Sequence, residues 1–152
     1  MAEALLASSS SRIFVKSKPS VFTHYSASRI QIRSMATSNF KKITIQRDDT
    51  SFDAYVVGKD NAPGIVVLQE WWGVDFEVKN HAIKISQLQP GFKALIPDLY
   101  RGKVGLDVAE AQHLMDGLDW QGAVKDIQAS ANWLKANGSK KVDFIFYCCS
   151  YS

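Results

Sequence analysis

The stretch that most constrains the fold is residues 64–73, which read Gly-Ile-Val-Val-Leu-Gln-Glu-Trp-Trp-Gly. A short apolar run bounded by glycine predicts a strand that is buried on both faces, as in a parallel sheet. An acid, Glu70, stands where this strand would leave the sheet. Open α/β folds place their functional groups at the carboxyl ends of parallel strands. Glu70 is therefore the first candidate functional residue.

The remaining pattern from residue 39 onward predicts an α/β sheet that begins with an antiparallel hairpin at its edge. The expected strands cover residues 43–45, 52–57, 65–69, 92–96 and 142–149, and the expected helices cover about 75–88, 107–115 and 119–136. Asp75 and Asp119 are predicted to cap their helices, and Val108, Ala111 and Met115 to form one apolar face. Few residues follow the last strand, so we expect an incomplete doubly wound sheet.

Residues 1–38 differ in composition from the rest of the chain. They contain ten serines and five basic residues but a single acid, Glu3. This composition is typical of an organelle transit peptide, and the excess of serine over arginine favours plastid over mitochondrion. A simply disordered N-terminus, which would leave the protein in the cytosol, is the open alternative.

Composition and spacing exclude several classes of function. Residues 39–152 carry 13 basic and 14 acidic side chains without a basic patch, so no nucleic-acid partner is predicted. No apolar run approaches the ~18 residues of a membrane span. There is no glycine-rich phosphate loop, and the adjacent Cys148 and Cys149 lack metal-ligand spacing. We therefore predict no membrane association, no cofactor and no metal.

Other polar residues allow more than one interpretation. His81 flanks the apolar stripe of its helix and is expected to be partly buried and structural, whereas His113 is expected to be exposed. Asp98 follows Pro97 at a strand end and is expected to turn or cap the chain. Arg101 fits equally well as a ligand for an anionic substrate group and as a solvated loop arginine.

Three segments taken together are more specific. They are Gln69-Glu70, the run Ile-Pro-Asp-Leu-Tyr-Arg-Gly at 96–102, and residues 112–120 before the long helix. From about residue 40 to 142 the chain resembles the dienelactone hydrolase family, in its plant organelle-targeted branch. The resemblance implies an α/β-hydrolase fold, of which this chain would hold the N-terminal half. It also implies hydrolysis of a small-molecule lactone or carboxylic ester through a cysteine nucleophile, without a cofactor.

The resemblance also assigns roles to individual residues. Cys148 stands where the family has its nucleophile, and Glu70 matches the glutamate that contacts the nucleophile and helps to generate its thiolate. The backbone N–H groups of Trp71 and Cys149 would form the oxyanion hole. Arg101 lies beside the position of an arginine that binds the substrate carboxylate.

The sequence departs from the family after Val142. The family elbow reads Gly-x-Cys-x-Gly-Gly, but here Phe146 replaces the first glycine and Ser150-Tyr151 replaces the others. The family Asp and His follow the nucleophile, and three residues follow Cys149 here. We therefore expect a truncated hydrolase domain over residues 39–152 without activity. The alternatives are a non-catalytic binding module that self-associates through an exposed sheet edge, and a gene-model fragment.

Overall fold

The computed structural model describes residues 40–48 and 50–146. Its strands are β1 (Lys41–Arg47), β2 (Thr50–Gly58), β3 (Gly64–Leu68), β4 (Lys93–Pro97) and β5 (Val142–Phe146), and its helices are α1 (Phe76–Gln87), α2 (Val108–Asp116) and α3 (Trp120–Ala136). The transit segment predicted over residues 1–38 lies outside the described residues and stays a prediction.

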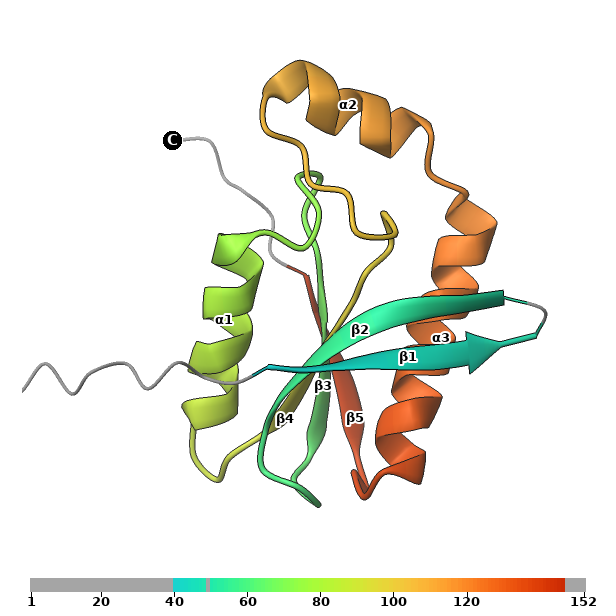
Figure 1. Ribbon diagram of the computed structural model, residues 1–152. Coiled ribbons are helices and arrows are strands. Elements are labelled where there is room, and N and C mark those ends of the chain that lie inside the picture. The colour runs from blue at the N-terminus through green and yellow to red at the C-terminus, as the bar shows by residue number, and fades with distance from the viewer. Residues whose placement is uncertain (1–39, 49, 147–152) are drawn as a thin grey trace, which may run out of the picture. The chain divides into compact units, whose positions relative to one another are not determined.

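The described strands form one mixed sheet in the order β1-β2-β4-β3-β5. β1 and β2 make the predicted antiparallel hairpin at one edge, with Ile45 opposite Phe52. β3 lies between two parallel partners, β4 on one side and β5 on the other, and Leu68 is paired with Phe146. Figure 1 shows α1 on one face of this sheet and α3 on the other. The expected α/β sheet with helices on both faces is confirmed.

Burial explains why β3 and β4 are apolar without alternation. All five residues of each strand are buried, because successive side chains enter different cores. On the α3 side, Val66, Leu68 and Leu95 pack with Ala131 and Leu134. The core on the α1 side contains Ile65, Val67, Ala94 and Ile96 together with the helix residues Val78, Ala82 and Ile85. The prediction of a strand buried on both faces is confirmed.

The helix caps agree only in part with the sequence. The Asp75 carboxylate accepts a hydrogen bond from the Val78 N–H at 2.9 Å, as predicted. Asp119 also occupies the N-cap position of α3, as predicted, but its side chain makes no capping hydrogen bond. Its carboxylate lies beside Gly122 in the first turn of α3, in space that a side chain at that position would occupy.

The predicted apolar face of α2 is wrong. Only Ala111 is buried, whereas Val108 is 57% exposed and Met115 is half-buried. Ala111 packs on Gly105, where an added Cβ would come within 2.8 Å of it. Figure 1 shows α2 above the carboxyl ends of β3 and β4 rather than on the sheet face, so α2 covers a loop. No helix among the described residues is long and apolar enough to cross a membrane.

The two capping aspartates give a matched test of helix termination. Replacing Asp75 by alanine is expected to lower the free energy of unfolding by about 1 kcal/mol, because the Val78 N–H loses its acceptor. The same change at Asp119 is expected to stay within about 0.5 kcal/mol, because no cap bond is lost there. Urea denaturation of both variants measures the difference, and equal losses would contradict the cap assignment.

Candidate functional site

The chain makes a tight turn where it leaves β3. The Gly73 N–H donates to the Glu70 carbonyl at 3.1 Å, and Gly73 has a φ of +99°. Glu70 and Trp71 are half-buried within this turn. The rings of Trp71 and Trp72 meet edge to face with centroids 5.0 Å apart. This turn therefore holds Glu70 and Trp71 at the carboxyl end of a central strand.

The loop that follows β4 is folded around Asp98. This residue is 2% exposed, and its Oδ2 accepts a hydrogen bond from the Gly102 N–H at 2.9 Å. Its Oδ1 is buried and accepts no hydrogen bond among residues 40–48 and 50–146. Asp98 therefore turns the chain, as the sequence predicted, and it brings Arg101 to the rim of the sheet.

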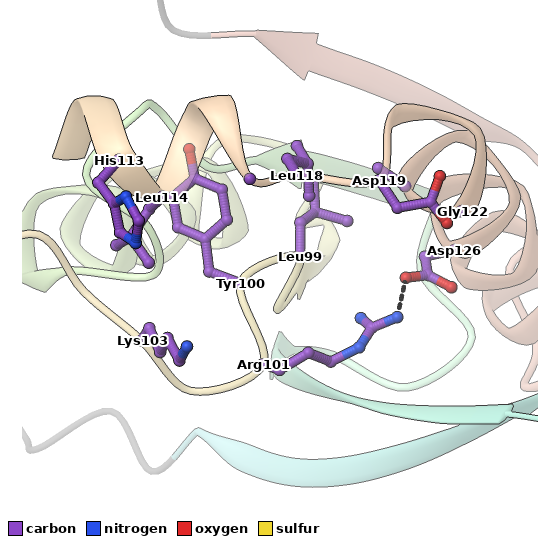
Figure 2. Close-up of a pocket in the computed structure, with 12 residues that line it drawn as sticks. Leu99, Tyr100, Arg101, Lys103, His113, Leu114, Leu118, Asp119, Gly122 and Asp126 are labelled. Carbon is purple, nitrogen blue, oxygen red and sulfur yellow. Dashed lines mark hydrogen bonds and ion pairs between the residues drawn. The ribbon is translucent and has the colours of Figure 1, made fainter. Parts of the chain in front are cut away.

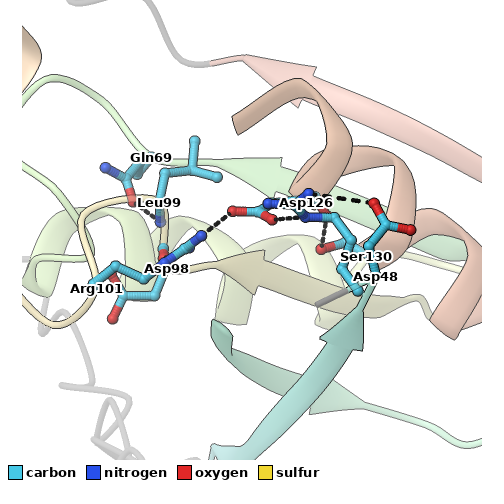
Figure 3. Close-up of polar contacts among 8 residues, drawn as sticks. Asp48, Gln69, Asp98, Leu99, Arg101, Asp126 and Ser130 are labelled. Carbon is cyan, nitrogen blue, oxygen red and sulfur yellow. Dashed lines mark hydrogen bonds and ion pairs between the residues drawn. The ribbon is translucent and has the colours of Figure 1, made fainter. Parts of the chain in front are cut away.

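The two strand exits are joined to one another. The Gln69 side-chain oxygen accepts from the Leu99 N–H at 3.0 Å, as Figure 3 shows. A second bond of 2.9 Å runs from the Gly105 N–H to the Trp72 carbonyl, and Gly73 forms an isolated bridge with Val104. The loops after β3 and β4 consequently form one connected unit.

Arg101 belongs to a cluster of charges that spans three elements. Its Nη2 lies 2.6 Å from Asp126 Oδ2, and the other carboxylate oxygen, Oδ1, lies 2.7 Å from Arg47 Nε. Asp126 comes from α3 and is 1% exposed, whereas the Arg101 side chain is 43% exposed. Arg101 also donates to the Asp98 carbonyl and lies over the Phe52 ring. Arg101 is therefore anchored on one side, while its side chain remains exposed in the loop, and both interpretations of this residue stay open.

A pocket of about 430 Å³ lies beside this cluster, between the loop after β4, α2 and the start of α3 (Figure 2). Arg101, Lys103 and His113 bring basic side chains to its wall, and Leu99, Tyr100, Leu114 and Leu118 bring apolar ones. Burial raises the pKa of the Tyr100 hydroxyl above its ordinary value. The lining contains no residue of the turn at 69–73. Two acids, Asp119 and Asp126, also line the pocket, so its wall combines an apolar part with charges of both signs.

The predicted site residues are brought together in part. Glu70 and Trp71 lie in the loop after β3, and Arg101 lies in the loop after β4. Hydrogen bonds join these two loops. His81 is half-buried on α1 and His113 is exposed on α2, as expected. Cys148 and Cys149 lie outside the described residues. Among the residues that the structure does describe, no group of His, Cys, Asp and Glu is arranged to hold a metal.

The sequence analysis did not single out Asp126, although its position in the sequence indicates that it is buried. It stands three residues after Ala123 and four before Ser130, and all three side chains are buried on α3. A carboxylate within the buried stripe of a helix requires a positively charged partner. The identity of the partners, Arg47 and Arg101, depends on long-range packing and cannot be read from that spacing.

Comparison with known proteins identifies a family over most of this structure. A model described as the Dienelactone hydrolase family matches residues 52–150, which is more than half of the chain. Protein usf from Aquifex pyrophilus is 33% identical over 100 residues, which cover 60% of this chain and 42% of the relative.

Solved structures agree on the fold. One is a structure from Klebsiella pneumoniae that is provisionally described as a dienelactone hydrolase. It superposes with a TM-score of 0.63 and is 19% identical, and the match covers 72% of this chain and 50% of that one. A dienelactone hydrolase-like promiscuous phosphotriesterase from metagenomic libraries gives 0.58 at 23% identity, with 72% and 49% covered. The chain thus spans about half the length of these proteins. The likeness confirms the α/β-hydrolase fold.

Two glycines with similar backbones test how tightly the joined loops are packed. An added Cβ at Gly73 would come within 2.7 Å of the Lys103 carbonyl oxygen, whereas at Gly102 it would meet nothing within 4 Å. Alanine at either position has an unfavourable positive φ, which costs about 1 kcal/mol. We expect Gly73→Ala to lose at least about 1 kcal/mol more than Gly102→Ala, because the first also displaces backbone. Urea unfolding of both variants decides, and equal losses would show that the loops adapt without strain.

Proposed function

Since the chain belongs to the dienelactone hydrolase family, we propose that the site at the ends of β3 and β4 is part of a hydrolase site for small-molecule lactones or carboxylic esters. In this reaction a thiolate attacks the carbonyl carbon, the ester or lactone C–O bond breaks, and the leaving oxygen takes a proton. Water then hydrolyses the acyl-enzyme thioester, which releases the acid and regenerates the thiol. The protein groups required are an activated cysteine, donors for the oxyanion and a positive charge for an anionic substrate.

The observation that supports this proposal most directly is the register of β3 and β5. Leu68 is paired with Phe146 in parallel strands. Glu70 and Cys148 each follow these residues by two positions in the sequence, and this equal spacing supports the assignment of Cys148 as the partner of Glu70. We assign the nucleophile to Cys148, its activation to Glu70, and the oxyanion donors to the backbone N–H groups of Trp71 and Cys149.

Arg101 is proposed as the substrate-binding residue. Two of its five guanidinium donors contact Asp126 and the Asp98 carbonyl, which leaves three for a ligand. The pocket that it lines adds Lys103 and His113 around an apolar interior. A substrate with a carboxylate on an unsaturated or aromatic body has the complementary chemistry.

The polypeptide of residues 1–152 is proposed to lack turnover by itself. Phe146, Ser150 and Tyr151 stand where the family elbow has glycines, and bulky side chains oppose the strained turn that a nucleophile elbow requires.

The turnover of this chain is tested with an aryl ester and a dienelactone. We expect product formation by the wild-type chain to equal that of a Cys148→Ala variant, since the elbow does not present the thiol. Lys84→Gln, which changes an exposed side chain on α1, serves as the surface control. Clear turnover above the Cys148→Ala background, lost again in Glu70→Gln, would contradict inactivity and support the proposed catalytic roles.

A second candidate function is a binding module that associates with itself through β5. Phe144 is 45% exposed and Phe146 is 74% exposed, and among the described strands β5 is paired with β3 alone. An apolar strand with an open edge is a template for pairing with another copy.

Sedimentation analysis of the full 152-residue chain tests this second candidate. Self-association through β5 predicts a dimer that Phe144→Lys converts to monomer, because a charge is placed at the paired edge. Leu106→Lys changes another apolar side chain, 87% exposed in the loop before α2, and should leave the dimer intact. A monomeric wild type, or an equal response to both substitutions, would exclude β5 as the interface.

A further inference from the structure

In the cluster around Asp126, two arginines share one buried carboxylate, and the exposed carboxylate of Asp48 lies beside one of them, Arg47. Asp126 Oδ1 lies 2.7 Å from Arg47 Nε and Oδ2 lies 2.6 Å from Arg101 Nη2, as shown in Figure 3. A buried carboxylate needs one positive partner to offset its desolvation, and here two are present. Asp126 by itself therefore leaves part of the second positive charge unneutralised.

The two arginines differ in what surrounds them. The Arg47 side chain is 13% exposed and does not line the pocket, whereas Arg101 is 43% exposed and forms part of its wall. Arg47 Nη1 also lies 3.6 Å from Asp48, but that carboxylate is 69% exposed and strongly screened by solvent. Arg47 is thus the buried arginine at Asp126, 2.7 Å from its carboxylate, and Arg101 is the arginine that faces the pocket.

We propose that Arg47 is a positioning residue that sets the anion affinity of the pocket without touching its occupant. By pairing with Asp126, Arg47 prevents that carboxylate from neutralising Arg101. This inference rests on the proposed role of Arg101 as the ligand for an anionic group. The ligand class is a small organic carboxylate, since Arg101 and Lys103 line the wall together with leucine and tyrosine side chains. Of the two acids in the wall, Asp119 and Asp126, the second is already paired with two arginines.

The proposal predicts that substitutions of Arg47 and of Asp126, the two partners of one ion pair, change the anion affinity of the pocket in opposite directions. Without Arg47, the whole charge of Asp126 acts on Arg101, so an anion binds less tightly. Without the charge of Asp126, Arg101 is released from its competitor, so an anion binds more tightly. A purely structural role would lower the affinity in both variants, because both would loosen the pocket wall.

The experiment measures the binding of benzoate and of its neutral isostere benzamide to the full 152-residue chain by chemical-shift titration. We expect the wild type to prefer benzoate and Arg101→Gln to abolish the preference. Arg47→Gln should weaken benzoate binding roughly three- to tenfold, the effect of one charge a few ångströms away in a partly screened site. Asp126→Asn should strengthen it by a similar factor, and benzamide binding should not change. Arg47→Lys should stay close to the wild type.

Lys42→Gln is the matched control. Lys42 is also a cation of β1 with a carboxylate partner, 2.8 Å from Asp53, but the Asp53 carboxylate contacts Lys42 and Thr44 rather than Arg101. Its loss should leave the preference for benzoate unchanged.

The outcomes separate this inference from the proposed function. A wild type without preference for benzoate, or a preference that survives Arg101→Gln, overturns the proposed role of Arg101 and the inference with it. Suppose that the preference for benzoate depends on Arg101. The inference alone is then overturned if Arg47→Gln does not weaken benzoate binding, or if Asp126→Asn weakens it. If Asp126→Asn does not fold, the contrast between Arg47→Gln and Arg47→Lys decides.

Discussion

The burial of β3 on both faces is the constraint on which the rest of this structure depends. A strand without a polar face must be covered from both sides and paired along both edges, because its backbone groups have no access to water. Helix α1 and helix α3 supply the two covers, and β4 and β5 supply the two edges. The carboxyl end of β3 is consequently surrounded by loops from several elements. That is the reason why chemistry concentrates there.

Hydrogen bonds and ion pairs between side chains hold the loops together at this end of the sheet, beyond the hydrophobic core. Gln69 and Leu99 tie the exits of β3 and β4, and Asp126 reaches them from α3 through Arg101. Removing one partner of a buried ion pair typically costs about 3–5 kcal/mol, because the remaining charge stays desolvated. Asp126 therefore joins α3 to the hairpin and to the loop after β4 with one side chain. The same contacts decide how much positive charge Arg101 presents to the pocket.

Conservation of a fold and presence of an activity are separate questions in this chain. The hairpin, the β3–α1–β4 unit and α3 build an α/β-hydrolase sheet of the dienelactone hydrolase family. The turn with Glu70 and Trp71 is in place at the end of β3. The proposed nucleophile at Cys148 follows β5 directly in sequence, where Phe146 replaces a glycine of the family elbow. On the proposed function, activity thus depends on the short segment that begins at the end of β5.

The sequence by itself determined the strands, the helices and the candidate residues Glu70 and Arg101. Strand and helix follow from local periodicity, and a residue after a buried strand must lie at the edge of the sheet. It failed at Val108, because α2 covers a loop instead of the sheet. It found Asp119 at the N-cap of α3 but did not indicate that the carboxylate turns towards Gly122 instead of accepting a capping bond. Only the tertiary structure decided that Arg47 and Arg101 meet at one carboxylate. They are far apart along the chain, and no local spacing encodes a contact that depends on how the hairpin, the loop after β4 and α3 pack together.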